Sequence, residues 1–169
     1  MFVESGYNRK KALDYAKKWA LSRNPAYYDF EEIGGDCTNF LSQCLYAGTG
    51  VMNPKLYTGW YYYSVNSRAP AWTAVANFYE FLLNNTGAGP YGHNASAEDV
   101  VPGDFVQLAT EHDYYHHSGI IVKKDSSYDL NKIYIATHSF DTYQNPLSNY
   151  SIRQIRFIKI DGCRKYINI

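Results

Sequence analysis

A glycine turn followed by a helical apolar pattern constrains this chain more than any other stretch. Gly34 and Gly35 form the turn, Asp36 or Thr38 can cap a helix that starts there, and Gly48 can end it. Apolar side chains recur along one face of that helix at Cys37, Phe40, Leu41, Cys44 and Leu45. The pattern therefore predicts a buried helix with a cysteine in its first turn.

The place of Cys37 indicates a possible nucleophile. A helix start offers free N–H groups and the positive end of the dipole, which favour the reactive thiolate. The alternative is that Cys37 is simply the first apolar residue of a buried helix, as free cysteines often are. Cys44 lies two turns further along, about 10 Å away, too far for a disulfide with Cys37. Cys163 has no evident partner.

Length and charge narrow the class of protein. At 169 residues we expect one domain, 1–169, with its core at about 7–160. Lys and Arg number 16 and Asp and Glu number 16, so no excess charge points to nucleic acid. No apolar run is long enough for a membrane span, and the first residues lack the pattern of a signal peptide. We expect a monomer without nucleic-acid or membrane partners. It would be cytoplasmic, or extracellular or in the cell envelope if it is a piece of a longer secreted protein.

The order of the predicted elements indicates an α+β fold. Helical patterns cover residues 8–23 and a segment that begins at Pro70, whereas 48–69 and 87–98 look like loops. Short strands separated by turns follow at 105–109, 117–122, 133–138 and 152–160. We therefore expect N-terminal helices packed on one face of an antiparallel sheet.

Two histidines are placed to serve a cysteine nucleophile. His117 opens one predicted strand and His138 closes the next, so both should lie at the same edge of the sheet. We expect Cys37 as nucleophile, His117 as base and later acid, and His138 as the group that orients the base. Small residues at Gly119 and Ala136 would let the cysteine helix lie close.

Other residues are candidates for binding. The N–H of Cys37 is the natural oxyanion donor, with Asp36 or Tyr28 as a second contact. Trp60 opens the aromatic cluster 60–63, which could either wall a substrate groove or cap the core.

A metal site is the main rival use of the histidines. His112, His116 and His117 are close in sequence, and His138 or Cys44 could join them. The chain has no Cys-x-x-Cys or His-Glu-x-x-His signature, so we expect no metal and no organic cofactor.

Four stretches resemble one known family. The segment 35–45 followed by Gly48 resembles the cysteine motif of a bacterial amidase domain family, related to the NlpC/P60 and CHAP group of papain-like cysteine peptidases and amidases. The stretches 102–106, 117–122 and 134–139 resemble the Pro-Gly-Asp strand, the histidine strand and the strand with the third polar residue in that wider group.

The resemblance implies a papain-like fold. By position it also implies Cys37, His117 and His138 as the catalytic set, with His116 a weaker candidate for the base and Asp141 an alternative third member. Many NlpC/P60 members have Asp-Cys-Ser-Gly where this chain has Asp-Cys-Thr-Asn, which places it in the amidase branch.

The expected function is hydrolysis of an amide through a thioester by a cysteine amidase or peptidase. The resemblance implies cell-wall peptides, such as those of peptidoglycan, as a substrate class. The alternative is a non-catalytic glycan- or peptide-binding module that uses the aromatic residues 60–63 with Tyr114 and Tyr115.

Overall fold

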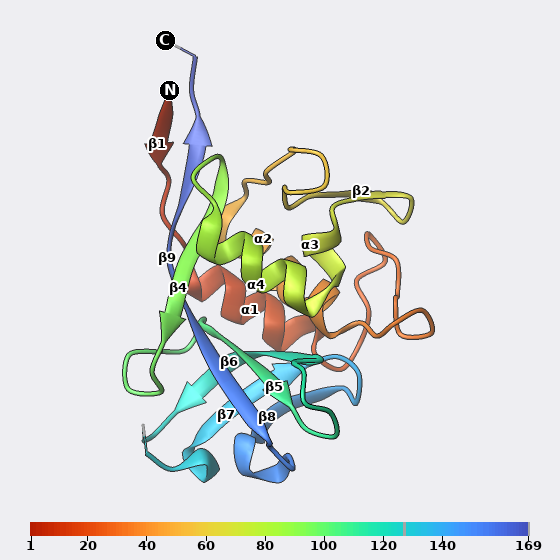
Figure 1. Ribbon diagram of the computed structural model, residues 1–169, viewed down its shortest axis with the longest axis vertical. Coiled ribbons are helices and arrows are strands. Elements are labelled where there is room, and N and C mark those ends of the chain that lie inside the picture. The colour runs from red at the N-terminus through yellow and green to blue at the C-terminus, as the bar shows by residue number, and fades with distance from the viewer. Residues whose placement is uncertain (127, 169) are drawn as a thin grey trace.

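One antiparallel sheet and a layer of helices make up the fold, as expected from the sequence (Figure 1). The computed structural model describes residues 1–126 and 128–168. The strand order is β1-β9-β5-β6-β7-β8, and β4 also pairs with β9. The strands are β1 (Phe2–Glu4), β4 (Gly89–Ala95), β5 (Phe105–Ala109), β6 (His117–Lys124), β7 (Ile133–Thr137), β8 (Thr142–Pro146) and β9 (Gln154–Tyr166).

The helices precede most of the sheet along the chain. They are α1 (Arg9–Trp19), α2 (Cys37–Thr49), α3 (Pro70–Thr73) and α4 (Val75–Asn84), with a small hairpin of β2 (Tyr62–Ser64) and β3 (Ser67–Arg68) between α2 and α3, and the short 3₁₀ turns η1 (Leu130–Lys132) and η2 (Leu147–Asn149) further on. No described helix has both the length and the apolar character needed to cross a membrane.

Local sequence explains the ends of the two long N-terminal helices. The Asn8 side chain accepts a hydrogen bond from the Lys11 N–H and caps α1, which ends at Trp19 rather than at residue 23. Helix α2 begins at Cys37 as predicted but runs past Gly48. A Cβ on Gly48 would lie 2.5 Å from the Tyr7 ring. This glycine therefore permits close approach of the segment before α1, and Gly50, in the left-handed region, ends the helix.

Two cores lie on opposite faces of the sheet. The first is between the helices and the sheet and contains most of the buried face of α2 together with Ile120 and Ala136. The second covers the far face and contains Ile121 and Ile135. Because side chains alternate along a strand, Ser118 and Ile120 of β6 face α2, whereas His117 and Gly119 belong to the far face.

The sheet is larger than the sequence predicts. Residues 87–98 were expected to form a loop, but β4 pairs along β9 in that region. A Cβ on Gly92 would lie 2.2 Å from the Lys159 carbonyl oxygen of β9. Gly92 makes the sequence look less like a strand, but the close pairing of β4 with β9 leaves no room for a side chain at this position. Strand β9 also extends beyond residue 160 and pairs with β1, which the sequence pattern did not reveal.

Candidate functional site

Cys37 lies at the start of α2, packed against strand β6. Its side chain is 6% exposed, and its sulfur lies 3.8 Å from the Thr38 hydroxyl. Burial raises the pKa of the thiol, and the negative charge of Asp36 adds to that effect, although the backbone of Ser118 and the Thr38 hydroxyl act in the opposite direction. The direction of this shift is opposite to the one expected from the helix start, and burial is its main cause.

His138 is buried directly after β7 and uses both ring nitrogens. Its Nδ1 lies 2.5 Å from Oδ2 of Asp36, and its Nε2 lies 2.8 Å from the Trp19 carbonyl oxygen. The ring also stacks on Phe40, with the centroids 4.1 Å apart. A carbonyl oxygen only accepts hydrogen bonds, so Nε2 carries a proton. His138 thus joins α1, the start of α2 and the end of β7, and it makes no hydrogen bond to His117.

Asp36 is the centre of this network. Besides binding His138, its carboxylate accepts hydrogen bonds from the Phe30 N–H and the Asn39 side-chain amide, both at 2.8 Å. The residue is completely buried. Its expected role as a second oxyanion contact is therefore not supported, since a carboxylate would also repel an oxyanion.

Arg23 connects the network to the surface. Its guanidinium binds Asp141 through two hydrogen bonds of 2.7 and 3.1 Å and lies 3.2 Å from Asp29. It also lies 3.6 Å from Asp36. Asp141, the alternative third member, therefore binds Arg23 and makes no hydrogen bond to either His117 or His138.

His117 lies at the expected edge of the sheet but on the face away from α2. Pairing of Ile120 with Ala136 brings the start of β6 and the end of β7 to one edge, as predicted. The His117 ring lies 5.7 Å from the Tyr150 ring, which packs against the second core. Burial lowers its pKa to about 4, so the ring is neutral near pH 7. No hydrogen bond joins it to Cys37.

Gly119 also points to the face of the sheet away from α2, where it packs against the second core. A Cβ on this residue would lie 2.7 Å from Cδ1 of Ile135, which belongs to the second core. The expectation that Gly119 makes room for the cysteine helix is therefore wrong, although a small residue is indeed required there.

Neither of the other two predicted binding residues, Trp60 and Tyr28, makes a hydrogen bond to the Cys37 side chain. Trp60 is completely buried, and its indole N–H donates to the Ser42 hydroxyl, so it belongs to the core and is not a groove wall. Tyr28 is 46% exposed, and its ring packs edge-on against Phe30. In the loop before β6, His112 stacks on Tyr114, and His116 packs edge-on against both rings. Among residues 1–126 and 128–168, no group of three or more His, Cys, Asp or Glu is arranged to hold a metal.

A polar chain that the sequence did not reveal runs from Cys37 across the sheet. The Thr38 hydroxyl lies 3.2 Å from that of Ser118, which accepts a hydrogen bond of 3.3 Å from the Gln107 amide. The Gln107 carbonyl oxygen accepts two more from Arg156, at 2.8 and 2.6 Å. These residues are distant in sequence, and the register of Gln107 opposite Ser118 is what joins them.

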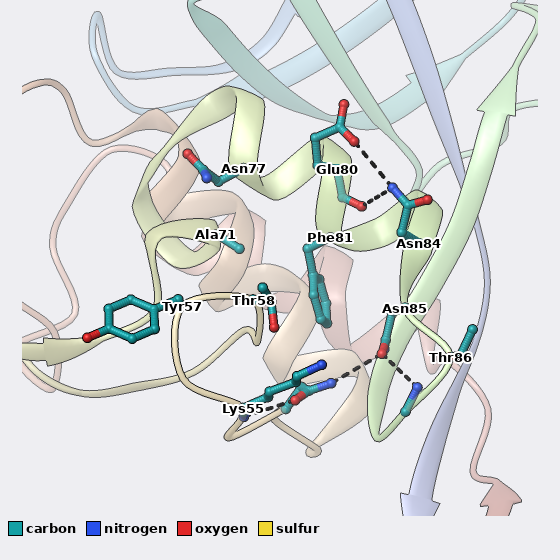
Figure 2. Close-up of a pocket in the computed structure, with 12 residues that line it drawn as sticks. Lys55, Tyr57, Thr58, Ala71, Asn77, Glu80, Phe81, Asn84, Asn85 and Thr86 are labelled. Atoms are coloured by element: carbon teal, nitrogen blue, oxygen red, sulfur yellow. Dashed lines mark hydrogen bonds between the residues drawn. The ribbon is translucent and has the colours of Figure 1, made fainter.

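A separate hollow of about 400 Å³ lies between α4 and the loop before β2. Figure 2 shows Phe81 projecting from α4 between Thr58 and Lys55 on one side and Asn85 on the other. The lining is rich in side-chain amides and contains none of the residues that we predicted for catalysis.

Comparison with known proteins relates most of the chain to one family. A family model described as "Putative amidase domain" matches residues 6–160. The chain is 39% identical over 123 residues to uncharacterized protein YhbB of Bacillus subtilis (strain 168), which is 70% of this chain and 38% of that protein. It is 27% identical over 150 residues to uncharacterized protein YjcM of the same strain, which is 83% of this chain and 33% of that protein. The chain thus spans only about a third of the length of these relatives. No solved structure matches it.

Proposed function

The chain belongs to the Amidase_6 family of amidase domains, and on this premise we propose that it is a cysteine-dependent amidase or peptidase. The observation that carries the proposal is the position of Cys37. Its sulfur lies at the first residue of a helix and interacts with the backbone of Ser118, the residue after His117. The nucleophile and the free N–H groups of a helix start thus meet strand β6 one residue from His117, whose ring lies on the other face of the sheet.

The proposed reaction has two stages. His117 takes the thiol proton as the Cys37 sulfur attacks the amide carbonyl carbon, and the N–H of Cys37 stabilises the oxyanion. The C–N bond then breaks, and the His117 imidazolium gives its proton to the leaving amine. Water, deprotonated by His117, attacks the thioester carbon, and the C–S bond breaks to restore the thiol and release the acid.

The starting state of this mechanism is a neutral pair and not a thiolate–imidazolium pair. The pKa of Cys37 is raised and that of His117 is lowered to about 4, so both groups are uncharged near pH 7. General-base catalysis needs a neutral imidazole, which this environment supplies. Because the His117 ring lies on the face of β6 away from α2, the mechanism requires the backbone at the start of β6 to rearrange so that the ring leaves Tyr150 and reaches the Cys37 sulfur.

In this proposal His138 positions the nucleophile and does not orient the base. Its bonds to Asp36 and to the Trp19 carbonyl fix the residue before Cys37 relative to α1. A papain-like fold related to NlpC/P60 proteins and a cell-wall peptide substrate are further parts of the proposal, supported by the motifs around Cys37 and His117.

The proposal is tested by hydrolysis of a panel of peptide amides and muropeptides with matched variants. We expect Cys37→Ser and His117→Ala to lower kcat/KM by at least about a thousandfold, as removal of a nucleophile or its base does in related mechanisms. Cys163→Ser and His93→Ala should retain activity, because both residues lie on other strands. Activity retained in Cys37→Ser would overturn the proposal.

The hollow in Figure 2 favours a second candidate function, a glycan- or peptide-binding module. Side-chain amides both donate and accept, which suits hydroxyl and peptide groups, and the volume lies within the ~300–1,000 Å³ of small-molecule sites. This site differs from the aromatic groove expected from the sequence, because Trp60 is buried. Saturable binding of a muropeptide by an inactive chain, lost in Asn84→Ala, would favour this candidate.

A further inference from the structure

Arg156 is a cation held firmly in place without a carboxylate partner. Its guanidinium carbon lies 3.5 Å from the ring centroid of Tyr79 and 4.0 Å from that of Tyr115. Tyr79 comes from α4 and Tyr115 from the loop before β6, so two separate segments of the chain enclose the group. Such stacking fixes the plane of the guanidinium and the direction of its N–H groups.

The hydrogen bonds of Arg156 leave part of the group unused. Nε and Nη2 both donate to the Gln107 oxygen, which is neutral. Nη1 makes no hydrogen bond to any residue that the structure describes, and it is not buried. Burial of the side chain lowers the pKa of Arg156. Glu80 acts on it through space but forms no ion pair with it.

This arrangement differs from that of Arg23, another arginine with a partly buried head group. Arg23 is surrounded by carboxylates, with Asp29, Asp36 and Asp141 within 4 Å. Desolvating a cation is costly unless an anion compensates for the lost water. Around Arg156, two aromatic faces and an amide oxygen compensate for the lost water. The positive charge of the guanidinium therefore remains available to a bound anion.

Arg156 is also connected to the proposed nucleophile. Gln107 binds both Arg156 and the Ser118 hydroxyl, and the Ser118 hydroxyl contacts Thr38, the residue after Cys37. These groups lie on the face of the sheet that α2 covers. A ligand group at Nη1 would therefore lie on the same side of the sheet as the Cys37 sulfur.

We infer that Arg156 forms an anion subsite that binds a carboxylate of the substrate beside the amide to be cleaved. Arginine is suited to this task because its planar fork matches the two oxygens of a carboxylate. The substrate class is then an amide or peptide with a free carboxylate near the reacting bond. The place of this subsite in catalysis rests on the proposed amidase function, whereas its affinity for carboxylates does not.

The first test measures binding without turnover. NMR spectra of the full chain, with the arginine side chains labelled with ¹⁵N, are recorded during titration with N-acetylglutamate and with neutral N-acetylglutamine methyl ester. We expect saturable shifts of the Arg156 Nε resonance with the carboxylate alone. Equal shifts with both compounds, or none with either, would overturn the inference.

The second test uses pairs of amide substrates that differ only in a free or a methylated carboxylate. We expect Arg156→Gln to lower the kcat/KM preference for the free acid at least tenfold, mainly through KM, and Arg156→Lys to restore part of it. Arg153→Gln is the matched control, since Arg153 is paired with Asp113 near the surface. An unchanged preference in Arg156→Gln would refute the subsite. Absence of hydrolysis in the native chain would refute the amidase proposal, and the NMR titration alone would then decide the subsite.

Discussion

The Nδ1 atom of His138 and the Oδ2 atom of Asp36 lie 2.5 Å apart in the interior, although the residues are separated by 102 positions in the chain. The contact fixes the end of β7 to the residue before Cys37. Neither side chain is more than 1% exposed, so water cannot replace a missing partner. The pair therefore controls both the stability of the domain and the position of the proposed nucleophile.

Replacing His138 should destabilise the fold strongly. We expect His138→Leu to lower the free energy of unfolding by about 3–5 kcal/mol, because it leaves the Asp36 carboxylate buried without its partner. Urea denaturation measures the change. The control is His93→Leu, which removes an exposed His93–Asp161 pair of 2.7 Å and should cost no more than about 1 kcal/mol. Equal losses in the two variants would contradict the argument.

The lowered pKa of His117 predicts a pH-dependent stability. A histidine with a folded pKa of about 4 binds fewer protons when folded than when unfolded, between that value and its ordinary value of 6.5. The free energy of unfolding should therefore rise with pH across this window and fall on acidification, by at most about 1.4 kcal/mol per pH unit from this group.

Urea midpoints at pH 7.5, 5.5 and 4.5 test this dependence, with His117→Gln as the comparison. The variant should lose less stability than the native chain between pH 7.5 and 4.5. If both chains respond equally to acid, His117 does not titrate as its burial implies.

Cys37 should react slowly with small alkylating agents. Its raised pKa leaves little thiolate at pH 7, so labelling by iodoacetamide should accelerate as the pH rises above the ordinary thiol range. Mass spectrometry of peptides locates the label, with buried Cys163 as the internal reference. Fast labelling of Cys37 at pH 6 would show instead a preformed thiolate.

Gly119 should not accept a side chain. A Cβ there would lie 2.7 Å from Cδ1 of Ile135, so we expect Gly119→Ala to cost about 1–3 kcal/mol through overpacking. Ile135→Val removes the clashing methyl group, and the double variant should be more stable than the sum of the two single changes predicts. Strict additivity would indicate that the contact is not the cause.

The sequence predicted the elements near Cys37 better than the directions of their side chains. The apolar spacing from Cys37 to Leu45 located α2, and the Asn8 cap located α1, because both are local signals. Alternation also showed that His117 and Gly119 share a face. It could not show which face meets α2, since both faces of β6 are buried.

Features that depend on pairing were not predictable from local patterns. Strand β4 contains glycines and a proline that resemble a loop, and only its partner β9 reveals their function. The sequence left open whether the Trp60 cluster lines a groove or caps the core, because it does not show that the Trp60 indole N–H binds Ser42. The Asp36–His138 pair and the Gln107–Ser118 contact likewise join residues that no spacing rule relates.

The pairing of β1 with the end of β9 places residues 2–4 beside residues 164–166 (Figure 1). The Met1 ammonium donates a hydrogen bond of 3.0 Å to the Ile167 carbonyl oxygen. A short linker could therefore close the backbone into a ring, with new ends opened in the exposed turn at 111–114. By the same geometry, a host protein could carry the whole domain in one surface loop, since its own chain would leave and return at a single point.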